Sequence, residues 1–298
     1  MEQICSDCPR ACQAQRTGNA GGGVCVSPML PRVIRAAPHY GEEPCISGTR
    51  GAGTIFFSGC NLRCVFCQNR EISRKSVGRI LSVSELRTLM LRLRDQGVHN
   101  IELVTPTHFT RVIAEALDGL ELGIPVVWNS SGYEKAETLR LLEGLVQVYM
   151  PDLKYLNSDT AKRYSAAADY PEVASAAISE MVRQRGSCRF DDAGLLQSGV
   201  IIRHLILPGH SAESMDVIDY VADSFSPGTV LFSLMSQYTP MPGLEARFPE
   251  LCRTVTAEEN ENLIHYLHAR RLQDGFWQEL SSVGEENIPI FDGSGLDF

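Results

Sequence analysis

Short apolar runs alternate with longer amphipathic stretches along most of this chain. The runs are nearly continuous and rich in β-branched and aromatic residues, which is typical of strands that are buried on both faces. They occupy residues 54–59, 101–106, 125–130, 146–151, 200–209 and 229–236. We therefore predict a strand at each of these positions.

The stretches between the runs carry apolar residues at helical spacing. In residues 82–97, Leu86, Leu89 and Leu93 share one face. Ser84 can cap the start of this helix, and Gly97 can end it. Comparable patterns lie at residues 110–123, 133–145, 170–186 and 212–225.

Strand and helix alternate about six times, which predicts an α/β fold with a parallel sheet and right-handed crossovers. Six units are too few for a closed eight-stranded barrel, so a partial barrel or a doubly wound sheet remains. In either fold the active site lies beyond the carboxyl ends of the strands. The tail from residue 274 lacks periodicity, and we expect it to be a loop over the domain.

Composition narrows the class of protein. The chain has 298 residues, 44% apolar and 21% charged, so a sizeable core is available. The net charge of −9, with no run of Lys or Arg, argues against a nucleic-acid partner. We find no signal-peptide pattern at the N-terminus and no apolar segment long enough to span a bilayer. These features predict a cytoplasmic protein without a membrane partner.

Ten cysteines are unlikely to form structural disulfides in a reducing compartment. Cys45, Cys188 and Cys252 are isolated, and we interpret them as small core residues. The others fall into two groups, and clustered thiols suit soft metals. One group, Cys60, Cys64 and Cys67, lies in "CNLRCVFCQN", directly after the first predicted strand.

The number of thiols in this group matters. Four thiolates close a zinc site or fill the four irons of a cubane cluster. Three thiolates leave one iron without a protein ligand, which is useful only if something else binds there. Phe66 lies between the second and third cysteines and is placed to cover a cluster or face a flat ligand. A zinc knuckle or chance clustering is the alternative.

The spacing Cys60-x3-Cys64-x-Phe66-Cys67 after a strand resembles the signature of the radical S-adenosylmethionine (SAM) superfamily. Nearly the whole chain, including "VTPTHF", "MPDLKY" and "MSQYTP", is similar to uncharacterised iron–sulfur proteins related to pyruvate formate-lyase activating enzyme. The resemblance implies a partial (β/α)6 TIM-like barrel and a 4Fe–4S cluster whose open iron binds SAM. It also implies reductive cleavage of SAM to a 5′-deoxyadenosyl radical, with an electron donor such as flavodoxin or ferredoxin.

The resemblance also implies roles for residues at the strand ends. Asp152 and Lys154 match a "DLK" motif and should contact SAM, while Arg203 matches the "R…PG" pattern of the activases on the fifth strand. In the activases a monovalent cation lies near SAM, at positions that match Asn129, Ser130, Met150 (through its backbone carbonyl) and Asp152 here. Because Asn129 replaces an Asp, one negative charge of that cation site is missing.

The chain departs from the activases after the second strand, where they carry a "GGE"-like turn that binds the amino group of SAM. Here the residues run from Thr105 to His108. Thr105 or neutral His108 can take that role, His108 can handle a proton, or it can simply pack at the strand end. His39, beside Glu42 and Glu43, either faces the mouth of the site or is solvated.

The second cysteine group has the pattern Cys5-x2-Cys8-x3-Cys12-x12-Cys25. Four thiols suit a closed metal site, either zinc or a second iron–sulfur cluster. Four unligated thiols are the alternative. We therefore predict a Cys-rich extension at residues 1–30, a radical SAM barrel at residues 31–250, and a C-terminal helix with a covering tail at residues 251–298.

Three functions remain open from the sequence. The first is a radical SAM enzyme that acts on a protein, as an activase of a glycyl-radical enzyme does. The second is a radical SAM enzyme that acts on a small molecule or a short peptide. The third, a non-catalytic iron–sulfur or zinc-binding module, is disfavoured because such a module needs neither an open iron nor a "DLK" strand end.

Overall fold

The computed structural model describes residues 3–280 and 290–297. Its strands are β1 Gln3–Ile4, β2 Gln15–Arg16, β3 Arg32–His39, β4 Ala52–Phe57, β5 Arg79–Ile80, β6 Ile101–Val104, β7 Val126–Ser130, β8 Val148–Pro151, β9 Arg189–Phe190, β10 Leu196–Leu205, β11 Leu231–Met235 and β12 Gly275–Trp277. Its α-helices are α1 Pro44–Ser47, α2 Arg70–Ser73, α3 Val83–Asp95, α4 Thr110–Leu117, α5 Ala136–Leu139, α6 Ser158–Ser165, α7 Tyr170–Arg185, α8 Ser211–Ser224 and α9 Ala257–Ala269. Short 3-10 helices are η1 Thr107–Phe109, η2 Arg140–Leu142 and η3 Pro249–Leu251.

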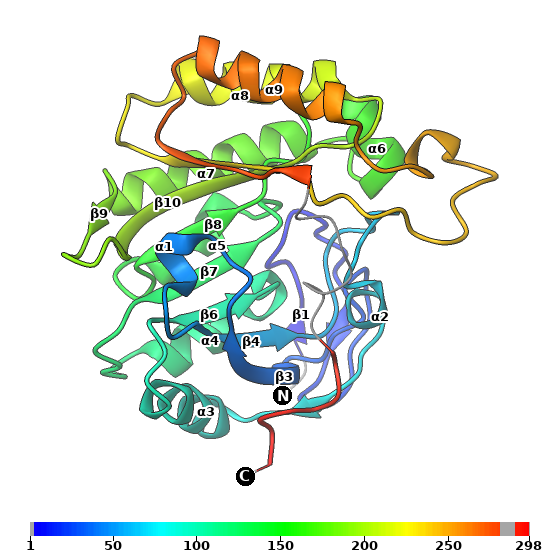
Figure 1. Cartoon of the computed structure of the whole chain (residues 1–298). Helices are drawn as coiled ribbons and strands as arrows, with labels where there is room; N and C mark the ends of the chain where they lie inside the picture. The colour runs from blue at the N-terminus through cyan, green and yellow to red at the C-terminus, as the bar shows by residue number, and fades with distance from the viewer. Residues whose placement is uncertain (1–2, 281–289, 298) are drawn as a thin grey trace.

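One curved sheet organises the molecule, and helices cover its outer side (Figure 1). Its strand order is β12-β11-β10-β8-β7-β6-β4-β3-β5, with β9 paired to β10. The strands from β4 to β11 along this path are all parallel, as expected from the helical crossovers between them. The predicted parallel α/β fold is confirmed, and in the described residues the sheet is an open, partial barrel.

The edges of the sheet differ from the sequence prediction. The β3 strand adds antiparallel to β4, and β12 adds parallel to β11 within the tail that we expected to be a loop. Three residues are too few to show a period, which explains why β12 was missed. Gly275 is needed there because a side chain would collide with the carbonyl oxygen of Phe232. Farther along, Ser294 accepts a hydrogen bond from the amide of Ala36 on β3, at 3.0 Å, so this part of the tail does cover the domain.

The α3 helix begins earlier than predicted. Ser82, not Ser84, caps it by accepting a hydrogen bond from the amide of Glu85, whose carboxylate in turn accepts from the Ser82 amide. Ser82 is the N-cap in preference to Ser84 because the two hydrogen bonds of this capping box satisfy backbone amides at the start of the helix. Leu86, Leu89 and Leu93 are buried against the sheet as the periodicity predicted.

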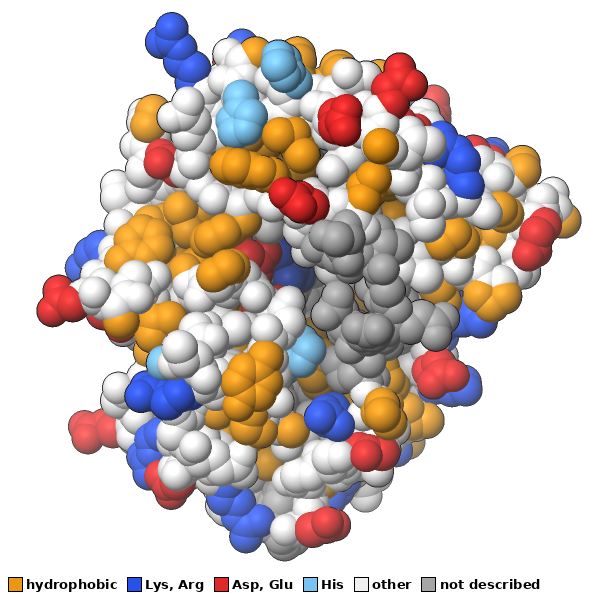
Figure 2. All heavy atoms as spheres, viewed as in Figure 1, with side chains coloured by type: hydrophobic (Ala, Val, Ile, Leu, Met, Phe, Trp, Pro, Cys, Tyr) orange, Lys and Arg blue, Asp and Glu red, His pale blue; other side chains and the backbone are white. Residues whose placement is uncertain are grey.

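Two surface observations complete the description. No helix in the described part of the chain is long and apolar enough to cross a membrane. Acidic and basic side chains are interspersed over the face seen in Figure 2, and that face carries no continuous basic patch.

Candidate active site

A cavity of about 250 Å³ lies at the carboxyl ends of the parallel strands. The ends of β4, β6, β7, β8, β10 and β11 all reach it, because parallel strands present their carboxyl ends at one edge of a sheet. It collects most of the residues that the sequence singled out: Cys60, Cys64, Phe66, Cys67, Thr105, Asn129, Ser130, Asp152, Lys154 and Arg203.

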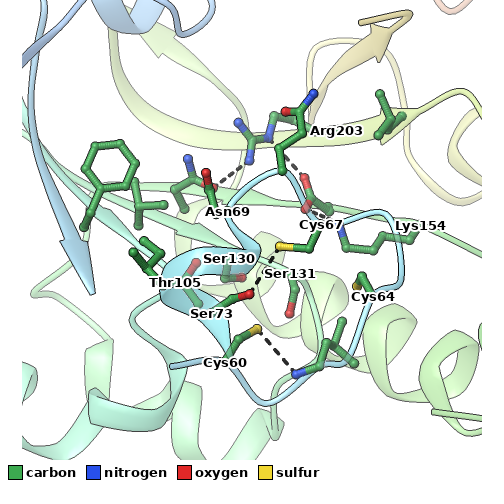
Figure 3. A pocket seen from close by; sticks show the side chains of 18 of the residues that line it. Cys60, Cys64, Cys67, Asn69, Ser73, Thr105, Ser130, Ser131, Lys154 and Arg203 are labelled. Carbon is green, nitrogen blue, oxygen red and sulfur yellow. Dashed lines mark hydrogen bonds and ion pairs between the residues drawn. The ribbon is translucent and has the colours of Figure 1, made fainter. Parts of the chain in front are cut away.

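The three thiols of the loop after β4 line this cavity (Figure 3), and each sulfur has a hydrogen-bond partner. The backbone amide of Leu62 donates to Cys60 Sγ at 3.4 Å, and Ser165 Oγ donates to Cys64 Sγ at 3.0 Å. The hydroxyl of Ser73 lies 3.4 Å from Cys67 Sγ. Such contacts fit sulfurs that carry negative charge as metal ligands.

A carboxylate and two cations face the thiols across the cavity. Lys154 Nζ lies 2.5 Å from one oxygen of Asp152, and Arg203 Nε lies 3.3 Å from the other. Burial alone would raise the pKa of Asp152, but Lys154 and Arg203 outweigh it, so this pKa lies below its ordinary value. The hydroxyl of Tyr170 fixes the strand end by donating to the Asp152 carbonyl and accepting from the Lys154 amide. Asp152 is therefore held ionised at the cavity wall.

Arg203 connects this pair to a buried polar chain that crosses the sheet. Its guanidinium donates to Asn129 Oδ1 at 2.6 Å, and its Nη1 lies 3.1 Å from Glu42 Oε2. Asn129 in turn donates to Glu102 at 2.7 Å, and Thr54 donates to the other Glu102 oxygen at 2.7 Å. Burial raises the pKa of Glu102, although these hydrogen bonds oppose the effect. This series of hydrogen bonds fixes the orientation of Arg203 toward Asp152.

The comparison with known proteins assigns this arrangement to a family. Residues 54–232 match the family model described as the radical SAM superfamily. The chain belongs to the radical SAM superfamily. The match runs from β4 into β11 and includes all three thiols of the loop and the Asp152–Lys154 pair.

A curated relative and several solved structures are also similar to this chain. An uncharacterised protein of Methanocaldococcus jannaschii is 30% identical over 236 residues, which are 76% of this chain and 64% of that protein. The chain thus spans less than two thirds of that relative. The structure of Streptococcus suis SuiB bound to S-adenosylmethionine matches with a TM-score of 0.51 at 14% identity, over 74% of this chain and 48% of SuiB. SuiB bound to the precursor peptide SuiA gives 0.50 at 13% identity, over 74% and 47%. These likenesses to SuiB show the fold alone.

The residues present fit the cluster that radical SAM membership implies. In the described part of the chain, no three Cys, His, Asp or Glu side chains converge as they would on a single metal ion. A cubane is larger than a single ion and needs its thiolates around one open space, and all three thiols line the same cavity. Burial raises the pKa of Cys60 to about 12, so the bare thiol is protonated at neutral pH and a bound metal must supply the compensating charge. Cys60, Cys64 and Cys67 would hold the cluster, and Asp152 and Lys154 would face SAM.

The structure separates the two candidates from the turn after the second strand. Thr105 lines the cavity, with a φ of 58° that turns the chain at the end of β6. His108 does not line it; this side chain is buried, and its Nε2 lies 2.9 Å from the carbonyl oxygen of Ser58. Of the alternatives raised from sequence, packing near a strand end describes His108 best. His39 lies at the cavity, with Nε2 3.9 Å from Glu42.

The oxygens considered for a monovalent cation already have partners. Asn129 Oδ1 accepts from Arg203, and the two Asp152 oxygens lie beside Lys154 and Arg203. These side chains supply the positive charge that a cation would bring. The described residues therefore give no support to a cation at this position.

Several buried acids of the site were not predicted. Glu134 accepts hydrogen bonds from Thr107 at 3.0 Å, from Trp128 at 2.9 Å and from Ser130. It thereby joins the turn after β6 to the end of β7. Glu102 interrupts the apolar run of β6, and an isolated charge in a buried strand is a signal that could have identified it.

The four N-terminal cysteines line a separate, small cavity.

Proposed function

We propose that this radical SAM protein cleaves SAM reductively and uses the resulting 5′-deoxyadenosyl radical to abstract a hydrogen atom from a substrate. When bound, a cluster reduced by the external donor would supply one electron to the sulfonium of SAM, and cleavage of the carbon–sulfur bond would give methionine and a 5′-deoxyadenosyl radical. The observation that supports this most directly is the cavity, where three thiols face the Asp152–Lys154 pair.

The chain's own residues have separate tasks in this proposal. Ser165 and Ser73 contact the sulfurs and tune the electron density on them. Asp152 can accept from a ribose hydroxyl or an ammonium, and Lys154 can pair with a carboxylate. Phe66 is 6% exposed and lies edge-on to Tyr238, with ring centroids 6.2 Å apart, which keeps water from this side of the loop.

We favour a polypeptide as the substrate, as for an activase of a glycyl-radical enzyme. The sequence similarity to activase-related proteins supports this, and so does the fold shared with SuiB, which was solved with a precursor peptide. The cavity is bordered by His39, Glu42 and Gln237, whose polar groups suit the amides of a peptide backbone. Flavodoxin or ferredoxin is the proposed electron donor.

The test uses the anaerobically reconstituted protein with SAM and dithionite. We expect 5′-deoxyadenosine and methionine in equal amounts. Glycine-deuterated peptides and glycyl-radical enzymes are then offered beside deuterated small molecules, and the 5′-deoxyadenosine is analysed for deuterium. Label from the polypeptides supports a polypeptide substrate, whereas label only from a small molecule overturns it. Absence of 5′-deoxyadenosine from a fully reconstituted protein would refute the proposal that this protein cleaves SAM reductively.

A further inference from the structure

The N-terminal segment brings four thiols together without using any of them in the active site. Cys5, Cys8, Cys12 and Cys25 line one small cavity, and all four are free of disulfides. The β1–β2 hairpin and a hydrogen bond from the Cys5 amide to the Ala14 carbonyl, at 3.0 Å, close the segment on itself. We call these four residues the N-terminal quartet.

The backbone leaves room for the sulfur of Cys12 inside this segment. Gly23 has a φ of +74°, and a Cβ there would lie 2.6 Å from Cys12 Sγ. The turn at Gly23 brings Cys25 back toward the hairpin, where this residue is buried together with Cys5 and Cys8. Only a residue without a side chain permits this close approach.

The surroundings of the quartet suit a negatively charged centre. Arg16 is 3% exposed, and its Nη1 lies 3.4 Å from Cys5 Sγ. Arg10 also lines the cavity. Four thiolates around a zinc ion, or around an oxidised 4Fe–4S cluster, carry a net charge of about −2, which two guanidinium groups balance.

An unpaired imidazole nitrogen borders the same cavity. His108 is 3% exposed, and its Nε2 must donate to Ser58, because a carbonyl oxygen only accepts. Its Nδ1 is therefore an unprotonated acceptor, and it is buried with no hydrogen-bond partner among the described residues. The lone pair needs a hydrogen-bond donor, and it is not itself an argument for a saturated metal centre, because thiolates bound to a metal only accept hydrogen bonds.

We propose that the N-terminal quartet binds a second metal centre, saturated by four thiolates and separate from the active site. Zinc and a 4Fe–4S cluster share this ligand chemistry. The small volume of the cavity, about 10 Å³, favours a single ion. The four thiols do not converge as they would on one ion, which favours a cluster, so the experiment distinguishes the two.

The centre supports the loop that carries the active-site thiols. Arg10 donates to the carbonyl of Asn61 at 2.8 Å, and Arg63 donates back to the carbonyl of Val24. A side chain on Gly59, the residue before Cys60, would collide with the Cys25 carbonyl. The metal centre therefore holds the segment that packs directly behind this loop.

The test isolates the second centre from the first. A variant with Cys60, Cys64 and Cys67 all changed to Ala is purified anaerobically, and its zinc, iron and sulfide are measured. We expect about one zinc per chain, or about four irons with matching sulfide. Adding Cys8→Ser and Cys25→Ser should remove this metal. Cys252→Ser should leave it in place, because Cys252 is exposed and not, as we expected from its isolation, a core residue.

Several metal contents would overturn the proposed second centre. Less than about a tenth of a metal per folded chain overturns the second centre, and metal that survives loss of Cys8 and Cys25 overturns the ligand assignment. If the alanine variant does not fold, the wild-type chain decides. About eight irons, or about four irons and one zinc, support the centre, whereas about four irons and no zinc refute it. These measurements need no SAM cleavage, so they stand or fall independently of the proposed function.

Discussion

The two cysteine groups of this chain differ in what surrounds them. The active-site thiols are partly exposed to a cavity of about 250 Å³, which a carboxylate and a lysine also line. The N-terminal quartet lines a cavity of about 10 Å³. The charged residues on the wall of that cavity are Arg10, Arg16 and Asp7. One group leaves space for a ligand, and the other leaves almost none.

This difference separates reactive from structural metal chemistry. A centre with an open coordination position needs both a missing ligand and room for a second molecule. The active-site thiols meet both conditions, since there are three of them beside a large cavity. The quartet meets neither. The number of thiols and the volume beside them therefore lead to the same conclusion for each group.

The largest expected effect comes from removing the active-site thiols. Changing Cys60, Cys64 and Cys67 together to Ala should abolish SAM cleavage, because no other soft ligand lies in that loop. The measurement is 5′-deoxyadenosine formed with SAM and dithionite. Cys252→Ser is the matched control and should retain wild-type activity. Wild-type amounts of 5′-deoxyadenosine from the triple variant would show that these three thiols do not hold the cluster that cleaves SAM.

The strands of the site could be predicted from sequence, whereas the partners of its polar groups could not. The runs that became β6, β7 and β8 are mostly apolar and every residue in them is buried, since both faces of these strands are covered. That pattern is local, so a window of a few residues reveals it. The resemblance to the "DLK" motif of the activases placed Asp152 and Lys154, which lie two residues apart at one strand end.

The partners that hold these residues come from distant parts of the chain. Ser165 lies 101 residues from Cys64, and Glu42 lies 161 residues from Arg203. No spacing rule connects such pairs, because they meet only through the order of strands in the sheet. His108 shows the same limit: its sequence position suggested the cavity, but its ring points to the N-terminal side.

A smaller effect is expected at the wall that faces the thiols. Lys154→Met should weaken SAM binding by about 1.5–3 kcal/mol, roughly ten- to a hundredfold, by removing one charge-assisted hydrogen bond. Isothermal titration of the reconstituted protein measures this, and iron content should stay unchanged. Lys162→Met, at an exposed lysine on α6, is the control. Unchanged affinity for SAM in the Lys154 variant would show that SAM does not lie against this wall.

Next in size is the hydrogen bond to one ligand sulfur. Ser165→Ala removes the donor that lies 3.0 Å from Cys64 Sγ, while Ser179→Ala, on the exposed side of α7, serves as the control. Because a donor to sulfur stabilises the reduced cluster more than the oxidised one, its loss should lower the midpoint potential. A difference of about 1 kcal/mol corresponds to about 40 mV for one electron. An unchanged potential with full iron content would mean that Cys64 is not a ligand.

The smallest effect concerns a buried acid that links the two regions. Glu134 accepts from Ser130 at the main cavity and from Thr107 in the turn that carries His108. Burial raises its pKa above the ordinary value near 4.5, and its three hydrogen bonds only reduce this shift. The folded chain therefore holds this proton more tightly than the unfolded chain. The contribution of Glu134 to the free energy of unfolding must fall as pH rises from about 4.5 through the raised pKa.

Glu134→Gln keeps the shape and the acceptor of this side chain but removes the titration. In urea unfolding under anaerobic conditions, the free energy of unfolding of the variant should depend less on pH between about 5 and 8 than that of the wild type. Glu172→Gln, at an exposed position on α7, should reproduce the wild-type slope. Equal slopes for the Glu134 variant and the wild type would mean that this carboxyl is already ionised when buried. The link between the two regions would then rest on a charged group, and the variant would differ from the wild type by the same free energy throughout this pH range.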